Sequence, residues 1–321
     1  MPSFSNPFSK QLLPACLLCL SLICNVAALA YPFMKLRKGL DNELYTLLHS
    51  VSLLWSKGLY VLSLLVVGFS ILFPFAKLGI LFWIISADGA GPRRQKWLER
   101  VERLGKWSML DVFLVSIILS LASKQFFVGA KPEIGLTLFI AAILVSMGTG
   151  ELIAARLHRE LPPPPAPSGR NGGFLLALSG IALIAALSLP FLRIEDWLLK
   201  NREYSILSLV PALWIQGAWV SSALSALFLV AAPILVFGAQ CYAWKTRGHP
   251  RWINRAQRWS MLDVFGLALV VFAIESDHLM KTEIHWGTVF LGATLLLQTA
   301  FSLVLQKANN APTPASPQRS A

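Results

Sequence analysis

The sequence predicts an all-α integral membrane protein in which eight transmembrane helices form two parallel four-helix repeats, with both termini in the cytoplasm. Three observations support this fold class. The chain is 55% hydrophobic and only 14% charged, whereas soluble domains carry about 25% charged residues. Eight stretches are long and apolar enough to cross the ~30 Å hydrocarbon core of a bilayer. A seven-residue motif occurs twice, at 107–113 and at 259–265.

The repeated motif is Trp-Ser-Met-Leu-Asp-Val-Phe, and a basic residue, Lys106 or Arg258, precedes each copy. Seven identical residues that recur 152 positions apart indicate two copies of one unit. A second match, between Trp55-x-x-Gly58 and its counterpart at 214–217, has an offset of 159. The offset changes because the basic loop between the two matches is shorter in the second copy.

The predicted spans divide evenly between the two copies. They are residues 12–34, 59–86, 110–129 and 136–157 in the first copy, and 174–192, 218–244, 262–280 and 287–306 in the second. Because each copy has an even number of spans, both copies enter the membrane from the same side, and the repeats are parallel. The predicted domains are a first unit at 1–160, a linker rich in Pro and Gly at 161–173, a second unit at 174–306 and a disordered cytoplasmic tail at 307–321.

The short loops predict the orientation, because cytoplasmic loops carry an excess of Lys and Arg. The loops after the second and sixth spans are strongly basic, whereas those after the first and fifth contain charges of both signs. The basic loops are therefore predicted to be cytoplasmic. The net charge of +12 then reflects topology and contact with anionic lipids. Nucleic acid is not a predicted partner, because the basic residues flank spans instead of forming a separate domain.

Two equivalent prolines, Pro74 and Pro233, lie in the inner halves of the second and sixth spans. Because proline removes an intrahelical hydrogen bond and clashes with the preceding turn, both helices are predicted to kink there. The simpler interpretation of each kink is helix packing, since neighbouring helices allow membrane spans to tolerate proline.

Each copy of the motif contains a tryptophan, a serine and, three residues after the serine, an aspartate. These residues are Trp107, Ser108 and Asp111 in the first copy and Trp259, Ser260 and Asp263 in the second. The serine and aspartate have the spacing of a reciprocal helix N-cap, and tryptophan suits the membrane interface. On one interpretation, therefore, the motif is a helix cap combined with an anchor at the membrane interface.

The other interpretation places the two carboxylates at the edge of the hydrocarbon, where an ionisable group needs a partner. Lys77 is the candidate partner of Asp111, although its side chain could instead extend to the interface. The position equivalent to Lys77 is Val236 in the second copy. Any polar pair of this kind therefore differs between the two halves.

Catalytic and metal-binding patterns are weak in this sequence. Cys16-x-x-Cys19 has the spacing of half a zinc site, but it lies inside an apolar span without a second such pair, so a packing role is predicted. The charged and histidine-containing segment at 275–285 is predicted to be a solvated turn. A nucleophile elbow, a phosphate-binding loop and an HExxH helix are absent from the sequence. The chain is predicted not to be an enzyme and to need no metal or cofactor.

The motif at the start of the third span of a four-span unit resembles the signature of the paraquat-inducible protein A family. The Trp-x-x-Gly approach to the second span, its later proline and Lys77 follow the plan of that family, and the resemblance covers about 12–306. It implies an inner-membrane protein of Gram-negative bacteria that works with a periplasmic MCE-domain protein and moves phospholipid between the two membranes. Double members of the family commonly carry a CxxC…CxxC zinc ribbon before each unit, and this sequence contains neither, so zinc is not expected.

On the lipid-transport hypothesis, the two units enclose a cleft for an acyl chain. The prolines bend its walls, and Lys77, Asp111, Ser260 and Asp263 form a polar point within it. Protonation of an aspartate would then couple transport to the proton gradient, since carboxylates within membranes serve as relays. Two alternatives stay open: a membrane anchor for an MCE assembly that transports nothing, and an exporter of small molecules or ions that needs no MCE partner.

Overall fold

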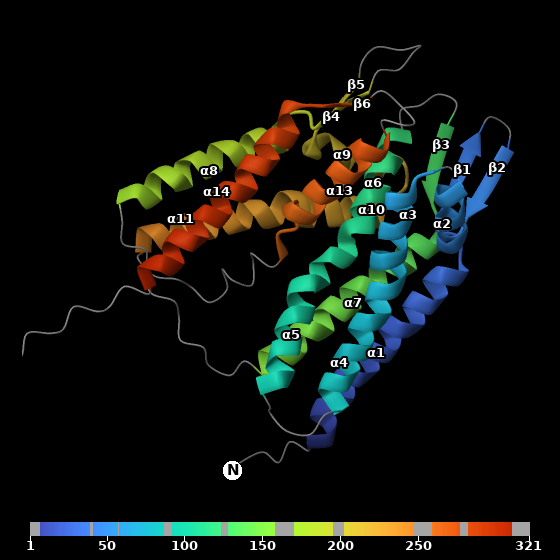
Figure 1. The fold of residues 1–321 in the computed structure, drawn as a ribbon, viewed down its shortest axis with the longest axis horizontal. Helices are drawn as coiled ribbons and strands as arrows, with labels where there is room; N and C mark the ends of the chain where they lie inside the picture. Colours follow the sequence, from blue (N-terminus) through green and yellow to red (C-terminus); the bar gives the residue numbers. More distant parts are fainter. Residues whose placement is uncertain are drawn as a thin grey trace, which may run out of the picture.

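The computed structural model describes residues 7–38, 41–56, 58–86, 92–122, 128–157, 170–194, 202–246, 259–276 and 282–309. Helices predominate, and they form two units of the same plan (Figure 1). Most of the predicted linker, the predicted tail from residue 310 onward, the basic loop of the second unit at 247–258 and the turn at 277–281 lie outside the described residues.

The helices of the two units correspond in order. In the first unit they are α1 (Pro7–Ala30), α3 (Tyr60–Leu65), η1 (Val66–Leu72), α4 (Phe73–Ser86), α6 (Leu110–Ala122) and α7 (Ile134–Leu157); in the second they are α8 (Arg170–Ser188), α10 (Trp219–Ser225), η3 (Ala226–Ala231), α11 (Ala232–Thr246), α13 (Leu262–Ser276) and α14 (Trp286–Asn309). Four stretches within the described residues are long and apolar enough to cross a membrane, namely Leu12–Ala30, Tyr60–Ser86, Ile134–Ala155 and Trp219–Tyr242. Shorter apolar helices accompany them. The chain is therefore a multi-pass membrane protein, while the count of eight spans stays a prediction.

Two small antiparallel sheets were missed by the prediction of an all-α fold. The first has the order β2-β1-β3, and the second has the order β5-β4-β6. Their strands are β1 (Met34–Lys38), β2 (Asp41–Tyr45), β3 (Val128–Pro132), β4 (Leu192–Ile194), β5 (Arg202–Tyr204) and β6 (Thr282–Ile284). In each unit a hairpin follows the first helix and pairs with the strand before the last helix, which ties the two helices together at one end, called here the sheet end (Figure 1).

Two short apolar helices, α2 (Leu47–Ser56) and α9 (Ile206–Ile215), were also not predicted. The Trp-x-x-Gly match forms the turn that follows each of them. In the first unit the Gly58 N–H donates to the Trp55 carbonyl at 3.1 Å, and the Leu59 N–H donates to the Leu54 carbonyl at 3.0 Å. This is a Schellman cap, which needs a left-handed residue. Gly58 and Gly217 supply it, with φ values of 81° and 78°.

Each proline lies directly after a π-helical segment. Pro74 is the second residue of α4, after η1, and Pro233 is the second residue of α11, after η3. A π-helical segment interrupts the regular i→i−4 pattern, and such segments are frequent at functional sites. The kinks themselves stay a prediction.

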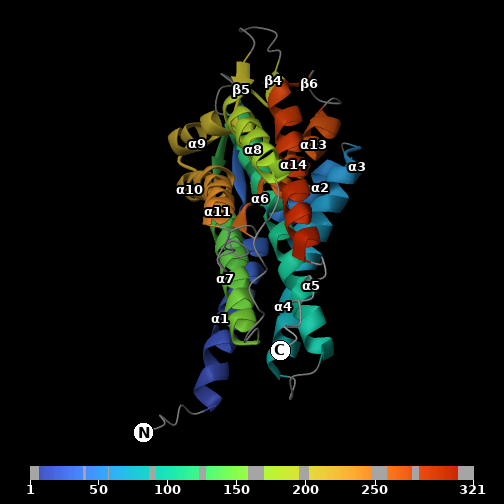
Figure 2. The same cartoon turned by 90° about the vertical axis from the view of Figure 1, so that its left-hand side faces the viewer.

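The units pack in the same internal way and meet through their motif helices. The first span lies along the last in each unit, as α1 with α7 and α8 with α14 (Figure 2). Between units α6 packs on α13, where the equivalent rings of Phe113 and Phe265 meet edge to face with centroids 5.9 Å apart. From this junction α1, α4 and α7 extend downward in Figure 1, whereas α8, α11 and α14 extend to the left.

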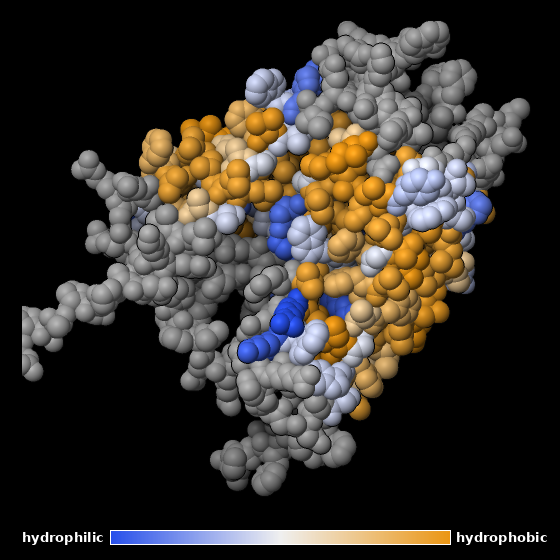
Figure 3. All heavy atoms as spheres, in the orientation of Figure 1, coloured by the Kyte–Doolittle hydropathy of each residue, from blue (hydrophilic) through white to orange (hydrophobic). Residues whose placement is uncertain are grey.

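On the face shown in Figure 3, the surface of the described residues is mostly apolar. Figure 3 shows hydrophobic atoms along the helices and a smaller group of hydrophilic atoms near the middle, between the units. Large apolar side chains such as Leu64, Ile184 and Leu296 are exposed. Exposed apolar surface of this extent fits contact with lipid.

Candidate functional site

Asp111 is buried inside the first unit and is bonded to a serine of the neighbouring span. Its carboxylate Oδ2 accepts a hydrogen bond from the Ser70 hydroxyl at 2.5 Å. Ser70 lies in the π-helical segment η1, and Asp111 lies in the first turn of α6. The side chain of Asp111 is 5% exposed. A buried carboxylate needs such a bond, because an unpaired buried charge is costly.

Lys77 has a different partner from the one the sequence predicted. Its Nζ donates to the Ser146 hydroxyl of α7 at 2.9 Å, and that hydroxyl donates to the carbonyl of Ile143 at 2.8 Å. The predicted pairing of Lys77 with Asp111 is therefore wrong. The alternative in which the side chain extends to the interface is also wrong, since Lys77 is only 3% exposed.

The predicted N-cap at Ser108 is not formed. The basic loop of the first unit is a helix, α5 (Pro92–Gly105), which continues through the 3₁₀ segment η2 (Lys106–Met109) into α6. Ser108 therefore lies within a continuous helical run, where the donors of a helix start are already bonded. Its hydroxyl is buried and has no hydrogen-bond partner among the described residues.

In the second unit the motif does stand at a helix start, but not with the predicted bonds. Helix α13 begins at Leu262, and the Phe265 N–H donates to the Met261 carbonyl at 2.9 Å. Met261, rather than Ser260, therefore holds the cap position. Asp263 lies in the first turn, where a carboxylate is favoured by the helix dipole, and its Oδ1 accepts the Val264 N–H at 3.0 Å.

Asp263 is also bonded to the other unit. Lys106, the residue before the first copy of the motif, donates to Oδ2 of Asp263 in a salt bridge. The two side chains are 24% and 30% exposed. This bond joins equivalent parts of the two repeats, because both residues belong to the motif segment. The two aspartates of the motif thus have different roles in the structure.

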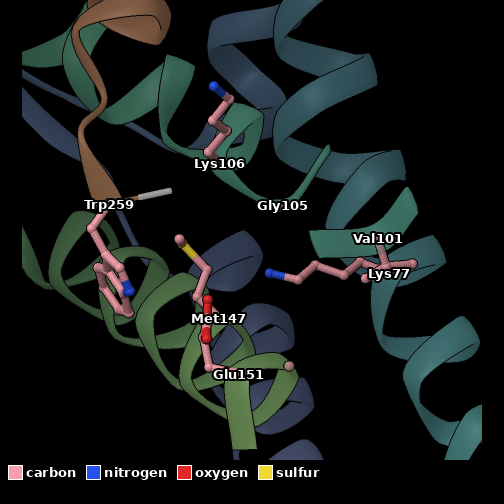
Figure 4. A pocket seen from close by; sticks show the side chains of 8 residues that line it. Lys77, Val101, Gly105, Lys106, Met147, Glu151 and Trp259 are labelled. Carbon is pink, nitrogen blue, oxygen red and sulfur yellow. The ribbon is translucent and has the colours of Figure 1, made fainter. Parts of the chain in front are cut away.

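A small cavity lies between the units beside these residues. It is lined by Lys77, Gly105, Lys106, Met147, Glu151 and Trp259, with Val101 and Gly150, and its volume is about 30 Å³ (Figure 4). This is room for about one water molecule. Trp259 comes from the second unit, and its ring stacks on Phe228 with centroids 5.7 Å apart. Trp107 packs, partly buried, against the main hydrophobic core.

The structure thus brings Lys77, Lys106 and Trp259 to one cavity and places the Asp111 pair beside a second one. That second cavity, of about 10 Å³, is lined by Asp111 and apolar side chains that include Phe69 and Val271. Sequence reasoning missed Ser70 and Ser146 as partners of Asp111 and Lys77. Their signal was present, because each is a polar residue inside an apolar span, where polar groups usually have a defined partner.

The remaining predictions concern the cysteines and possible metal ligands. Cys16 and Cys19 are exposed on α1, and Cys24 and Cys241 are partly buried; all are free thiols. Within the described ranges, no group of three or more His, Cys, Asp and Glu side chains could hold a metal ion.

The chain is similar to known intermembrane transport proteins over part of its length. The chain is 29% identical over 123 residues to the intermembrane transport protein PqiA of Escherichia coli K12, and the same values hold for the proteins of that name from E. coli O6:H1 and Shigella flexneri. The match covers 37% of this chain and 30% of each relative. No solved structure is significantly similar to the chain.

The family described as Paraquat-inducible protein A matches two separate regions of the chain, 13–159 and 174–309. Together these regions contain nearly all the described helices and both copies of the motif. The chain therefore belongs to the paraquat-inducible protein A family and contains the unit of that family twice.

Proposed function

We propose that the chain is the inner-membrane subunit of an MCE-type intermembrane lipid transport system of a Gram-negative bacterium, where it loads phospholipid into, or receives it from, a periplasmic MCE-domain partner. The relatives are named intermembrane transport proteins, which supports transport between membranes. The alignment spans 30% of their length, so substrate and partner are part of the proposal.

The observation that carries the proposal is the pair of buried polar contacts in the first unit, Ser70 with Asp111 and Lys77 with Ser146. Ionisable groups within membrane spans are costly and usually mark the pathway of a polar substrate or a proton. Asp111 is surrounded by apolar side chains, and Lys77 lies at a cavity that Lys106 and Glu151 also line. Such an arrangement suits a substrate with a polar head and apolar tails.

The proposed orientation follows from charge. Helix α5 carries a dense group of basic residues, namely Arg93, Arg94, Lys96, Arg100 and Arg103, so this end is assigned to the cytoplasm. The sheet end then faces the periplasm and the proposed MCE partner. Proton coupling through Asp111 is a further part of the proposal, because its carboxylate is buried among the spans of the first unit.

A photocrosslinking experiment tests the proposal. A photoreactive amino acid replaces Phe69, which lines the cavity at Asp111; a control probe replaces Leu296, which is 74% exposed. Lipid captured in cells is identified by mass spectrometry of the purified adduct. The expected result is phospholipid capture at position 69 that falls in Asp111→Asn, with no change at position 296.

Equal labelling at the two positions, unaffected by Asp111→Asn, would contradict the proposal. It would indicate ordinary bilayer contact and favour a membrane anchor that holds an MCE assembly. Transport activity that persists without any MCE partner would instead favour the exporter of small molecules.

A further inference from the structure

We infer that a groove in the first unit, between α2 and the start of the second span, is a binding site for one acyl chain of a membrane phospholipid. Helix α2 lies beside α3 at this point (Figure 1). The lining comes from Leu48, Val51, Ser52 and Trp55 of α2 and from Ser63, Leu64 and Val67 of the span. The inference depends on the membrane location of the chain and is independent of the proposed transport.

The first step is the size of the groove. Its volume is about 520 Å³, whereas the cavities beside Lys77 and Asp111 have volumes of about 30 and 10 Å³. Pockets that hold small ligands typically enclose about 300–1,000 Å³. The groove can therefore hold a stretch of hydrocarbon chain, whereas each smaller cavity has room for about one water molecule at most.

The second step is the chemistry of the lining. Five of its seven side chains are apolar, and the two serine hydroxyls already donate to backbone carbonyls. The Ser63 hydroxyl donates to the Val51 carbonyl at 3.1 Å, and the Ser52 hydroxyl donates to the His49 carbonyl at 2.9 Å. No charged side chain is among the described residues that line the groove. An ion or a polar head group would therefore lose its hydration without compensation, whereas a hydrocarbon chain would not.

The third step is the position of the groove relative to the membrane. One wall belongs to Tyr60–Ser86, a stretch long and apolar enough to cross a membrane, and Val61 of the same stretch is exposed. The groove is therefore continuous with surface that lipid covers in a bilayer. On α2 an exposed polar stripe lies next to the groove and consists of His49, Ser52 and Ser56. Amphipathic helices of this kind lie at the head-group boundary, so a lipid whose chain fills the groove can keep its head group at the surface.

The fourth step explains why the groove should hold a chain more firmly than flat surface does. Its two walls are fixed relative to each other by the turn at Gly58, by the bond from Ser63 to Val51 and by the edge-to-face contact of Trp55 with Tyr60, whose ring centroids are 5.0 Å apart. A chain between these walls makes van der Waals contacts on two sides. Because the walls are already in place, little ordering of the protein opposes binding.

Photolabelling of the full chain in bilayers of phosphatidylethanolamine and phosphatidylglycerol tests the inference. The probe is phosphatidylethanolamine with a diazirine in the middle of one acyl chain, and labelled residues are mapped by mass spectrometry of peptides. Label on Leu64 and Val67 should saturate as the mole fraction of the probe rises. Label on Ile184, an exposed apolar residue of the second unit, should rise in proportion to the probe.

Filling the groove provides the matched comparison. Val67→Trp should lower the label on the other lining residues at least about tenfold, because the indole excludes several methylene groups and burial of each favours binding about fourfold. Leu48→Trp fills the groove from the opposite wall and should have the same effect. Val61→Trp makes the first substitution at an exposed position that does not line the groove, and it should leave the label unchanged. Thermal unfolding in detergent identifies any variant that fails to fold, and the other filled variant then decides.

Label in the groove that rises in proportion to the probe, or that falls equally in Val61→Trp, would overturn the inference and indicate ordinary bilayer contact. Absence of label in the groove, with Ile184 labelled, would also overturn it and indicate that a second copy of the chain covers the groove. These measurements report binding alone. The proposed transport is tested separately at Phe69 and Asp111, which do not line the groove, so the two proposals can fail independently.

Discussion

The two repeats share one motif but place its aspartate in different surroundings. In the first repeat Asp111 is buried and bonded to Ser70, and Lys77 is bonded to Ser146. The equivalent positions in the second repeat hold apolar or amide side chains. Ser70, Lys77 and Ser146 correspond to Leu229, Val236 and Gln298. Asp263 instead is half-buried and bonded to Lys106 of the first repeat.

The comparison teaches that the motif alone does not define the site. The neighbouring spans decide whether its aspartate becomes an internal polar group or a contact between repeats. The second unit contains buried polar atoms of another kind: both amide atoms of Gln240 lack a hydrogen-bond partner within the described part of the chain, and so does the Ser179 hydroxyl. These groups are neutral, whereas those of the first unit include a lysine and an aspartate.

Among the exchanges between repeats, the largest effect is expected from making the first repeat resemble the second at its lysine. Lys77→Val, which copies Val236, should lower phospholipid transfer at least about tenfold, because a charged hydrogen bond to the polar head of the proposed substrate contributes about 1.5–3 kcal/mol. Transfer from proteoliposomes to acceptor vesicles, with the proposed partner present, measures this effect. Lys131→Gln, at an exposed position of β3, should leave transfer unchanged.

The partner of Asp111 offers a second exchange between repeats. Ser70→Leu, which copies Leu229, should destabilise the protein by about 1–3 kcal/mol, because it removes the bond to a buried carboxylate. Ser70→Ala, which also removes the hydroxyl but adds no bulk, separates loss of the hydrogen bond from crowding. Thermal unfolding in detergent compares the two variants. A loss in Ser70→Leu with none in Ser70→Ala would show that crowding, and not the lost hydrogen bond, destabilises the protein.

The bond between the repeats should contribute less. Lys106→Asp and Asp263→Lys should each destabilise the junction, and the double variant should recover about 1 kcal/mol, as expected for a partly exposed ion pair. A double-mutant cycle on unfolding free energy at low and high salt provides the measurement. Additive effects of the two substitutions would indicate that the bond does not join the units energetically.

The smallest effect tests a feature that the repeats share. Gly58→Ala and Gly217→Ala should each cost about 1 kcal/mol, since both residues have positive φ and alanine is strained there. No neighbouring atom would touch an added Cβ at either position, so steric crowding does not contribute. Unequal losses in unfolding free energy would show that the two turns are not equivalent, contrary to their matching hydrogen bonds.

The sequence predicted the features that repeat and missed those that depend on contact between distant segments. The Trp-x-x-Gly match and the paired prolines are local patterns, so the sequence alone was enough to match them between the two repeats. The two sheets were missed because the third strand of each pairs with a hairpin strand on the far side of two predicted spans in the sequence, as Pro132 does with Met34. The strands are also short and contain charges, which weakens any alternating pattern.

The partners of the candidate site were missed for a related reason. Lys77 and Asp111 were identified as ionisable groups within the membrane. The hydrogen-bond partner of each depends on how its helix is rotated about its own axis, and the sequence of an apolar helix without a clear polar face does not reveal that rotation. The predicted cap at Ser108 was wrong because α5 continues into α6 without a break. In the second unit the same motif does begin a helix.

The most direct test of the central claim compares the two aspartates of the motif in one assay. Asp111→Asn and Asp263→Asn are introduced separately, and phospholipid transfer is measured at matched protein abundance. The account predicts that Asp111→Asn reduces transfer to background, whereas Asp263→Asn keeps most of it and mainly weakens the contact between repeats. Equal loss in both variants, or full activity in Asp111→Asn, would contradict the assignment of the polar site to the first repeat.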